Sequence, residues 1–599
     1  MSSNKSVKYA ELVIDWLVQE GYTHCYFVAG GNIMHLLDGC RSRMVCVPVV
    51  HEVAAGIAVE YFNESGGDGR AFALVTAGPG LTNIITAMAG AWLESRELLV
   101  LGGQVKAEDL MSNGIRQRGI QEIDGVSLAA PVCKVAERIE HPWPQSRFLA
   151  AARQARQDRP GPVFLELCLD AQGAPVDPVH LSDIDDAWVA GSTVQLLEQG
   201  AAAANEIARL TKAAERPIWL LGGGVSRSTA AELHDELVAL GVPLMTTWNG
   251  ADRLSRLDPA YVGRPNTWGQ RSANVLVNEA DLVVVFGSRL GIQQTGFNWR
   301  AWAANATVVQ IDVDEHELSK GHPEVAVRVH GDANTALRGA VESLASHVFD
   351  GRWLNFCQEI RRRLPLRESC NVTAPGYVSP YDFYAALADI TNKEDVVIPC
   401  SSGGANSTAL QVFEPIAGQI MITDKGLASM GYGLAGAIGA SMAWPGRRTI
   451  LIEGDGGFTQ NLQELATVGV NALPIKIFVF ANNGYGSIRT TQRNYFGGAY
   501  LGCDTETGLG FPDWRKLFDS YGIPSVDLRP GWETDPAFLD SFGSRDPQAY
   551  IVPIDPEQTY WPKITSRITE AGSMESNPLH AMTPDLAPDV VEFIAGFTL

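Results

Sequence analysis

The sequence predicts an α/β protein built from three doubly wound domains with mainly parallel sheets. Short apolar runs typical of buried strands alternate along the whole chain with stretches that have the periodicity of amphipathic helices. Several of these runs end in glycine or in polar residues, as strands do where a parallel sheet presents its ligand-binding edge. The chain has 599 residues, which is enough for about three or four domains of ordinary size.

We expect four segments in order along the chain. Residues 1–185 form a first domain with strand-like runs such as CYFVAG, and residues 195–360 form a central domain with PIWLLGGG and LVVVFGS. Residues 376–558 form a third domain, and residues 559–599 form a tail that ends in a short helix. The glycines at 222–224 follow a strand but lack the GxGxxG spacing and an acidic partner. We therefore interpret them as a turn rather than a dinucleotide site.

Composition excludes some classes of partner. The chain has 46 basic and 68 acidic residues, which gives a net charge of −22 at pH 7. This excess of acid argues against nucleic acid or an anionic membrane as the main partner. The hydrophobic content of 46% is ordinary for a globular protein with large cores.

The cysteines and the first residues indicate a compartment. Nine cysteines are scattered along the chain without a CxxC pair, and their odd number does not suit a closed disulfide framework or a zinc site. Reduced thiols fit this pattern better. The first 22 residues have the pattern of an amphipathic helix rather than of a signal peptide, and no apolar run reaches transmembrane length. We therefore expect a cytoplasmic protein.

The most informative stretch lies in the third domain. An apolar strand at 449–452 stops at the turn Gly454–Gly457, and an amphipathic helix follows. A second strand at 475–480 ends at Asn482–Gly484. Because the carboxyl ends of parallel strands meet at one edge of a sheet, we expect these two turns to lie side by side.

The residue types at these turns point to a metal and a phosphate. The carboxylate of Asp455, the amide oxygen of Asn482 and a nearby main-chain carbonyl suit Mg²⁺ or Ca²⁺ bound together with phosphate oxygens. Gly456 and Gly457 open a helix, where free N–H groups favour a phosphate. The alternative is a pair of unrelated turns, which the paired strand–turn arrangement disfavours. The residues therefore predict a metal–diphosphate site.

This pairing of GDG with a later NN resembles the motif of thiamine diphosphate (ThDP) enzymes. The resemblance implies Mg²⁺ held by Asp455, Asn482 and the main-chain oxygen of Gly484, with Asn482 preferred to Asn483 because Ala481 stands where many relatives have another Asn. It extends through TAGPGLTN, GGQV, RGIQE and GLASMG, in the order found in the acetolactate synthase branch. Chains of that branch fold as pyrimidine-binding, central and diphosphate-binding domains.

Glu52 lies where an apolar strand, VCVPVV, meets an Ala-rich helix. Taken alone, it is a favourable first-turn charge on a helix. The resemblance implies that it hydrogen-bonds the aminopyrimidine ring of ThDP and so assists removal of the thiazolium proton. It also implies a homodimer or homotetramer, with Glu52 and the metal site of one active centre supplied by different subunits. The implied cofactor contacts are Gly80, Ser402, Gly403, Gly404, Ala428, Met430, Gly456 and Gly457.

The resemblance also narrows the reaction. Simple decarboxylases of this kind use a His-His pair, which is absent from the sequence, whereas Gln121 stands at the position used by carboligating synthases. We expect decarboxylation of a 2-keto acid, with pyruvate as the first candidate, and transfer of the acyl unit to a keto acid or a keto sugar. The tail is similar to that of acetolactate-synthase-like proteins of bacterial polysaccharide or secondary-metabolite pathways. The expected substrate pocket contains Gly31, Asn32, Ile120, Lys134 and Tyr485.

Some departures and alternatives stay open. Val135 replaces a family histidine, and Asn32 adds a polar group to a pocket that is apolar in the family, which favours an unusual acceptor. The runs 287–289 and 293–296 partly match a region that holds FAD in some members, so FAD remains open as a further cofactor. The alternatives are a ThDP lyase, decarboxylase or hydrolase acting on another carbonyl substrate, or a non-catalytic family member. The complete motif argues against the last.

Overall fold

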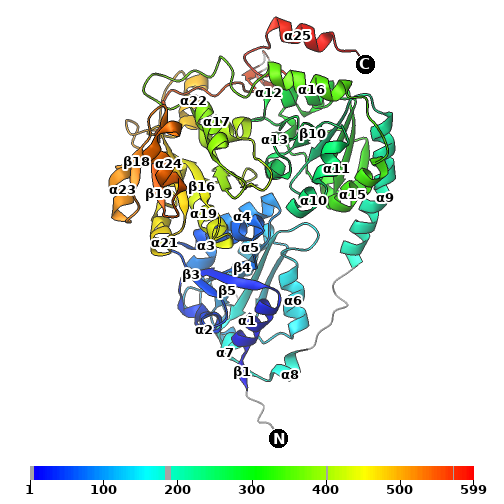
Figure 1. Cartoon of the computed structure of the whole chain (residues 1–599). Helices are drawn as coiled ribbons and strands as arrows, with labels where there is room; N and C mark the ends of the chain where they lie inside the picture. Colours follow the sequence, from blue (N-terminus) through cyan, green and yellow to red (C-terminus); the bar gives the residue numbers. More distant parts are fainter. Residues whose placement is uncertain are drawn as a thin grey trace.

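The computed structural model describes residues 6–112, 114–182, 191–399, 402–568, 570 and 572–598. Three parallel sheets, each with helices against it, form the body of the protein (Figure 1). The first domain is drawn in blue and cyan, the central domain in green, and the third in yellow and orange. The predicted fold class is therefore confirmed.

The first sheet has six parallel strands in the order β3-β2-β4-β5-β7-β6. Every residue of β5 and β7 is buried, since helices cover both faces of a parallel sheet. The strands are β2 (Tyr22–Phe27), β3 (Val45–Pro48), β4 (Arg70–Val75), β5 (Leu98–Gln104), β6 (Val135–Ile139) and β7 (Pro162–Cys168), beside the short antiparallel pair β1 (Val7–Lys8) and β8 (Pro175–Val176). The helices are α1 (Tyr9–Gln19), α2 (Met34–Cys40), α3 (Glu52–Ser65), α4 (Pro79–Glu94), α5 (Gly125–Ala129), α6 (Gln145–Arg153), α7 (Leu169–Gly173) and α8 (Pro178–Leu181).

The central sheet has five parallel strands in the order β10-β9-β11-β12-β13. They are β9 (Pro217–Leu221), β10 (Leu244–Thr246), β11 (Leu282–Phe286), β12 (Thr307–Asp312) and β13 (Val327–His330). The helices are α9 (Gly191–Ala213), α10 (Arg227–Glu232), α11 (His234–Ala239), α12 (Arg271–Glu279), α13 (Ile292–Thr295), α14 (Glu315–Ser319), α15 (Ala333–Leu344) and α16 (Arg352–Arg363). The predicted glycine turn directly follows β9, where Gly224 packs against Gly287 with no room for a side chain on either residue.

The third sheet has six parallel strands in the order β15-β14-β16-β17-β19-β18. Numbered within each domain, this is the strand order of the first sheet. The strands are β14 (Val396–Pro399), β15 (Ile420–Met421), β16 (Thr449–Gly454), β17 (Ile475–Ala481), β18 (Ser525–Asp527) and β19 (Gln548–Pro553). The helices are α17 (Pro380–Ile390), α18 (Gly403–Val412), α19 (Tyr432–Ala443), α20 (Asp455–Phe458), α21 (Leu465–Val470), α22 (Gly486–Tyr495), α23 (Trp514–Ser520) and α24 (Pro536–Gly543).

The first and third domains share one hydrophobic core, centred on α3 and α19. The two helices pack almost backbone to backbone, because a side chain at Gly439 would overlap the carbonyl of Ala58. Tyr61 from α3 and Tyr432 from α19 have ring centroids 6.3 Å apart in the same core. This close contact fixes how the ligand-binding edges of the two sheets lie relative to each other.

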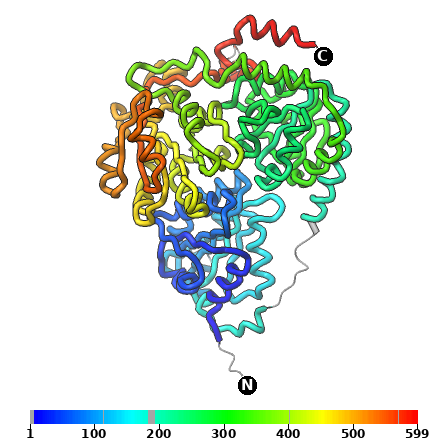
Figure 2. Tube along the Cα trace, in the orientation of Figure 1, coloured from blue at the N-terminus to red at the C-terminus, as the bar shows by residue number. Residues whose placement is uncertain are grey.

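The chain after β19 crosses the top of the molecule. It runs from the third domain to the central domain and ends with α25 (Pro588–Ala595), as the orange-to-red trace shows (Figure 2). Phe593 of α25 stacks on Phe356 of α16 with ring centroids 5.4 Å apart. A short antiparallel pair, β20 (Ser566–Ile568) and β21 (Met574–Ser576), lies within this segment. In the described ranges, no helix is both long and apolar enough to cross a membrane.

Candidate active site

Asp455 and Asn482 lie together at the carboxyl edge of the third sheet. Asp455 follows β16 and is 1% exposed. Its Oδ1 accepts the N–H of Gly456 at 2.8 Å, and its Oδ2 accepts the N–H of Asn482 at 2.9 Å. Burial raises the pKa of Asp455 to about 7, although the main-chain N–H groups around it, up to that of Gly484, act to lower it.

The oxygen atoms at this edge fit a cation. The Oδ1 of Asn482 is buried and has no hydrogen-bond partner within the described residues. A buried carboxylate and an unpaired buried amide oxygen are costly unless a cation is bound between them. The carbonyl of Gly484 accepts the N–H of Gly486 at 3.1 Å and keeps a second lone pair. This donor set of oxygen atoms suits Mg²⁺.

Metal sites of another kind are not found in the part of the chain that the structure describes. No cluster of three or more His, Cys, Asp or Glu side chains there is placed to hold a metal ion. The eight cysteines in the described ranges are free thiols, and the ninth, Cys400, lies outside these ranges. A cation at the third sheet therefore has to be held by one carboxylate together with amide and main-chain oxygens.

Two glycine-rich helix starts flank this edge. Helix α18 begins after Ser402, and Gly403 has the left-handed φ of +73°. Helix α20 begins at Asp455, and the ring of Tyr485 lies where a side chain at Gly456 would be. Free N–H groups at the start of α18 suit a phosphate, since the backbone can approach a ligand closely at glycine.

The loop before α19 holds the residues expected against the pyrimidine ring. Ala428 has a φ of +55°, a conformation that L-residues rarely adopt. Asp424 accepts the N–H groups of Leu427 and Ala428 at 3.3 and 3.4 Å and so shapes the loop. Burial, together with the nearby carboxylate of Glu94, raises the pKa of Asp424 well above its usual value. The Sδ of Met430 accepts a hydrogen bond from Gln460 at 3.8 Å.

Glu52 begins α3 at the carboxyl edge of the first sheet. Its side chain is 8% exposed, and its Oε2 accepts a hydrogen bond from Nδ2 of Asn83 at 2.9 Å. The loop before it is tied to the third domain, because Glu464 accepts the N–H groups of Val50 and His51 at 3.1 and 3.0 Å. Asn83 and Glu464 were not assigned roles from the sequence. Asn83 stands in the TAGPGLTN run, but nothing in its spacing shows its contact with Glu52.

Gln121 lies in a firmly anchored loop above the start of α4. Its φ is +61°, and its carbonyl occupies the space that a side chain at Gly78 would need, two residues before Gly80. Glu122 anchors the loop by accepting the N–H groups of Arg118 and Gly119 at 3.0 and 2.8 Å. The neighbouring Ile120 is 83% exposed on the chain surface.

The other residues expected in the substrate pocket separate into two groups. Gly31 and Asn32 follow β2 at the same carboxyl edge as Glu52, and Nδ2 of Asn32 is buried with no partner in the described chain. Lys134 precedes β6 and therefore lies at the opposite edge of the sheet. Its Nζ donates to the carbonyls of Gln157 and Arg159 at 2.6 and 2.9 Å, and burial lowers its pKa to about 8. Within the chain, Lys134 does not join the other pocket residues.

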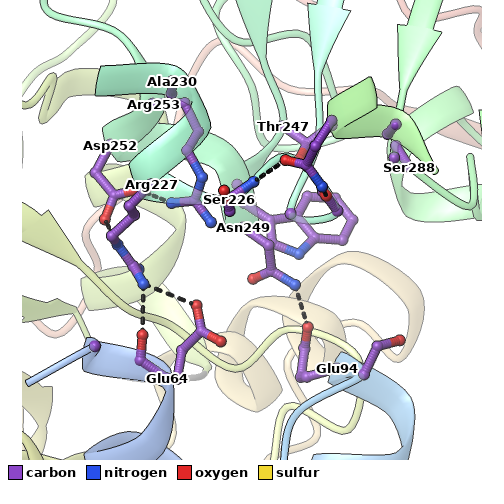
Figure 3. Close-up of a pocket in the computed structure, with 18 of the residues that line it drawn as sticks. Glu64, Glu94, Ser226, Arg227, Ala230, Thr247, Asn249, Asp252, Arg253 and Ser288 are labelled. Carbon is purple, nitrogen blue, oxygen red and sulfur yellow. Dashed lines mark hydrogen bonds and ion pairs between the residues drawn. The ribbon is translucent and has the colours of Figure 1, made fainter. Parts of the chain in front are cut away.

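A cavity of about 1340 Å³ lies where the three domains meet (Figure 3). Arg227 of the central domain pairs with Asp252 at 2.7 Å and with Glu64 of the first domain at 3.1 Å, so the domains are joined across the cavity wall. Asn249 donates to Glu94 in the same way. The wall also contains Gly223, Gly224, Gly287, Ser288, Arg289, Gln293 and Gln294.

Comparison with known proteins places these observations in a family. The N-terminal thiamine pyrophosphate (TPP) binding domain of TPP enzymes matches residues 7–128, the central domain matches 204–339, and the C-terminal TPP binding domain matches 402–551. The chain is 30% identical to a probable acetolactate synthase large subunit of Methanocaldococcus jannaschii, over 92% of this chain and 93% of that protein. It is 29% identical to the acetolactate synthase isozyme 2 large subunit of Escherichia coli, over 94% of this chain and 99% of that subunit.

Proposed function

Since this chain belongs to the thiamine pyrophosphate enzymes, in their acetolactate synthase-like branch, we propose that it is a Mg²⁺-dependent carboligase. It decarboxylates a 2-keto acid, with pyruvate as the first candidate, and joins the acyl unit to a carbonyl acceptor. ThDP, the cofactor of this enzyme family, supplies the nucleophilic carbon that adds to the substrate carbonyl.

The observation that carries the proposal is the unpaired Oδ1 of Asn482 beside the buried carboxylate of Asp455. Together with the carbonyl of Gly484 these atoms would hold Mg²⁺, which in turn would bind the diphosphate of ThDP. The N–H groups at the start of α18, near Gly403 and Gly404, would receive the same diphosphate. The residues of this chain would thus fix one end of the cofactor.

Glu52 would manage the proton at the other end of the cofactor. Asn83 holds Oε2 of the carboxylate and orients the group, so that Oε1 can exchange a proton with a ring nitrogen. Glu52 begins a helix that packs in the shared core, and it is almost free of solvent. A proton exchanged through Oε1 would serve activation of the cofactor and release of the product.

Gln121 and Asn32 support carboligation onto a polar acceptor. The rigid loop places Gln121 at the carboxyl edge of the first sheet, where an amide can hydrogen-bond the carbonyl oxygen of an acceptor. The buried Nδ2 of Asn32 is a donor without a partner in the described chain, and binding an oxygen of the acceptor would satisfy it. A keto sugar offers more such oxygens than a simple keto acid does, so it is the preferred acceptor class.

A homodimer or homotetramer would complete the site. The exposed tip of the Gln121 loop, with Ile120, is expected to lie against a second copy of the chain that supplies the metal edge. We place the enzyme in the cytoplasm, where its thiols would stay reduced.

The cavity between the domains is the proposed site for FAD. Its volume suits a large cofactor, and Gly287, Ser288, Arg289, Gln293 and Gln294, which suggested FAD in the sequence, all line it. Gly223 and Gly224 would let the backbone approach a pyrophosphate closely. The flavin absorption of the purified protein tests this assignment. If the flavin-free protein binds no FAD when FAD is added, the assignment is rejected.

The central experiment supplies pyruvate to protein reconstituted with ThDP and Mg²⁺ and follows substrate and products by proton NMR. Acetolactate or acetoin establishes carboligation, and a screen of acceptors that includes keto sugars then follows. If acetaldehyde is the sole product with every acceptor tested, the enzyme is a simple decarboxylase and the proposed carboligation is wrong. The Glu52→Gln variant is the control, since product formed at the same rate by this variant does not come from the proposed site.

A further inference from the structure

Tyr560, in the segment after the third domain, lies directly over the start of α18. A side chain at Gly404 would overlap both the hydroxyl oxygen and the Cζ of Tyr560. The tyrosine therefore occupies the space above the glycine that was assigned to the diphosphate. Glycine alone permits this close approach, because any larger residue would displace the ring.

The segment around Tyr560 is held at both ends of α18 and beside α22. The carbonyl of Pro562 accepts a hydrogen bond from Gln411, in the last turn of α18, at 2.8 Å. The carbonyl of Trp561 accepts one from Asn371 at 2.6 Å. Arg489 of α22 donates to the carbonyl of Pro556 at 2.9 Å. These bonds fix the backbone on either side of Tyr560, so the position of its ring is not accidental.

The hydroxyl of Tyr560 lies against Gly404 without a side chain between them. No hydrogen bond of this hydroxyl is found within the described residues, while Tyr384, beside the same helix start, donates its hydroxyl to the carbonyl of Ala405 at 2.7 Å. Tyr560 packs on the core of the third domain and is partly buried there. A phenol keeps its proton at neutral pH, so this hydroxyl can donate a hydrogen bond.

We propose that the Tyr560 hydroxyl binds the cofactor diphosphate, donating a hydrogen bond at the position where Gly404 offers no side chain. This inference rests on the proposed ThDP and Mg²⁺ site. It adds to that site a contact from the segment beyond the third domain. A neutral phenol serves well here, because it binds an anionic oxygen strongly without adding a charge beside the metal. The segment after β19 is thereby a part of the cofactor site.

The test measures binding of ThDP by calorimetry at saturating Mg²⁺ and compares wild type with Tyr560→Phe. Phenylalanine keeps the ring over Gly404 and removes only the hydroxyl. We expect the Kd for ThDP to rise about tenfold or more, as for loss of a hydrogen bond to a charged group. Magnesium pyrophosphate alone, which lacks the thiamine part, should show the same loss, whereas thiamine without a diphosphate should bind both proteins equally.

A matched control is Tyr550→Phe. Tyr550 is a buried tyrosine of the same domain whose hydroxyl bonds Ser541 at 2.9 Å, away from the start of α18. Its variant should lose some thermal stability and retain the wild-type Kd for ThDP. Equal Kd values for wild type and Tyr560→Phe would overturn the inference and leave the ThDP site standing. A wild-type protein that binds no ThDP would instead reject the proposed function itself.

Gly404→Ala gives an independent check. The added methyl group must displace the ring of Tyr560, so this variant should also weaken binding of ThDP. The loss of binding free energy in the double variant with Tyr560→Phe should be smaller than the sum of the losses in the two single variants, because both substitutions act through one contact. Fully additive losses would show that Gly404 and Tyr560 affect binding separately and would count against the proposal.

Discussion

The first and third domains share a strand order but use it for different purposes. In each, the third strand of the domain ends in a glycine turn at the carboxyl edge: Gly78 after β4, and Gly454–Gly457 after β16. In the third domain this edge is closed, since Asp455 is 1% exposed and the tail segment covers α18. In the first domain the loop above the edge is open, with Ile120 83% exposed. The same strand order thus supports a covered edge in the third domain and an exposed loop in the first domain.

The two edges differ in what they leave exposed. Water is excluded from the closed edge, so its unpaired oxygen atoms need a small ligand such as a cation. A loop with exposed apolar side chains suits contact with a larger protein surface. Val50, Ile115 and Leu128 of the first domain are exposed as well. Substitutions in each domain separately test whether the two edges have these different roles.

The largest effect is expected in the closed half. Asp455→Ala removes the only carboxylate of the proposed metal site and should abolish measurable binding of ThDP with Mg²⁺. Replacing a residue that only hydrogen-bonds a metal ligand already lowers metal affinity about 10- to 100-fold. Calorimetry measures the loss. Asp513→Ala is the control, since this exposed aspartate caps α23 and pairs with Lys516, so its loss should leave the affinity unchanged. Tight binding of ThDP by Asp455→Ala would reject the proposed metal site in the third domain.

The next effect separates chemistry from binding in the open half. Glu52→Gln keeps an oxygen for Asn83 and removes the acid, so turnover should fall about 10²- to 10⁴-fold while the affinity for ThDP stays close to that of wild type. Asn83→Ala should lower turnover less, because it disturbs only the orientation of Glu52. Stopped-flow or NMR rates give both values. If Asn83→Ala were the more damaging change, the proton exchange assigned to Glu52 would be rejected.

A smaller effect tests whether the open half meets a second chain. Ile120→Asp places a charge on the exposed loop, and we expect the Kd of the dimer to rise about thirtyfold, as for a central interface residue worth about 2 kcal/mol. Sedimentation at several concentrations measures this constant. Leu257→Asp is the matched control, since Leu257 is 73% exposed on the central domain. Dissociation by both variants, or by neither, would leave Ile120 without a specific role in the interface.

The sequence predicted the elements of each half better than their surroundings. The strands before Asp455 and Asn482 were predictable because a short apolar run that ends in a polar turn has few other interpretations. The placement of Lys134 was not, because the sequence does not show which end of β6 it occupies relative to the site. A motif alone gives the type of residue, whereas its edge of the sheet depends on where the strand begins and ends.

The tail shows the same limit more sharply. Tyr560 lies about 150 residues after Gly404, and nothing in its local pattern shows that the two residues touch. Contacts of this kind depend on the path of the chain after the last strand, which periodicity does not predict. Asn83 and Glu464 were missed for the same reason, since each acts on the loop of Glu52 from another element.

The smallest effect concerns the pH dependence of the closed half. With a pKa of about 7, Asp455 is largely protonated at pH 6 in the metal-free protein, whereas binding of Mg²⁺ requires the ionised form. The apparent affinity for Mg²⁺ should therefore fall about tenfold between pH 8 and pH 6, one decade for each unit below the pKa. Metal-free stability should change in the opposite direction. A raised pKa stabilises the fold at low pH, and this contribution is lost as the pH rises through about 7. An affinity for Mg²⁺ that is flat from pH 8 to pH 6 would show that Asp455 is already ionised. The closed edge would then be less strongly desolvated than its burial indicates, and its contrast with the first domain would rest on the covering segment alone.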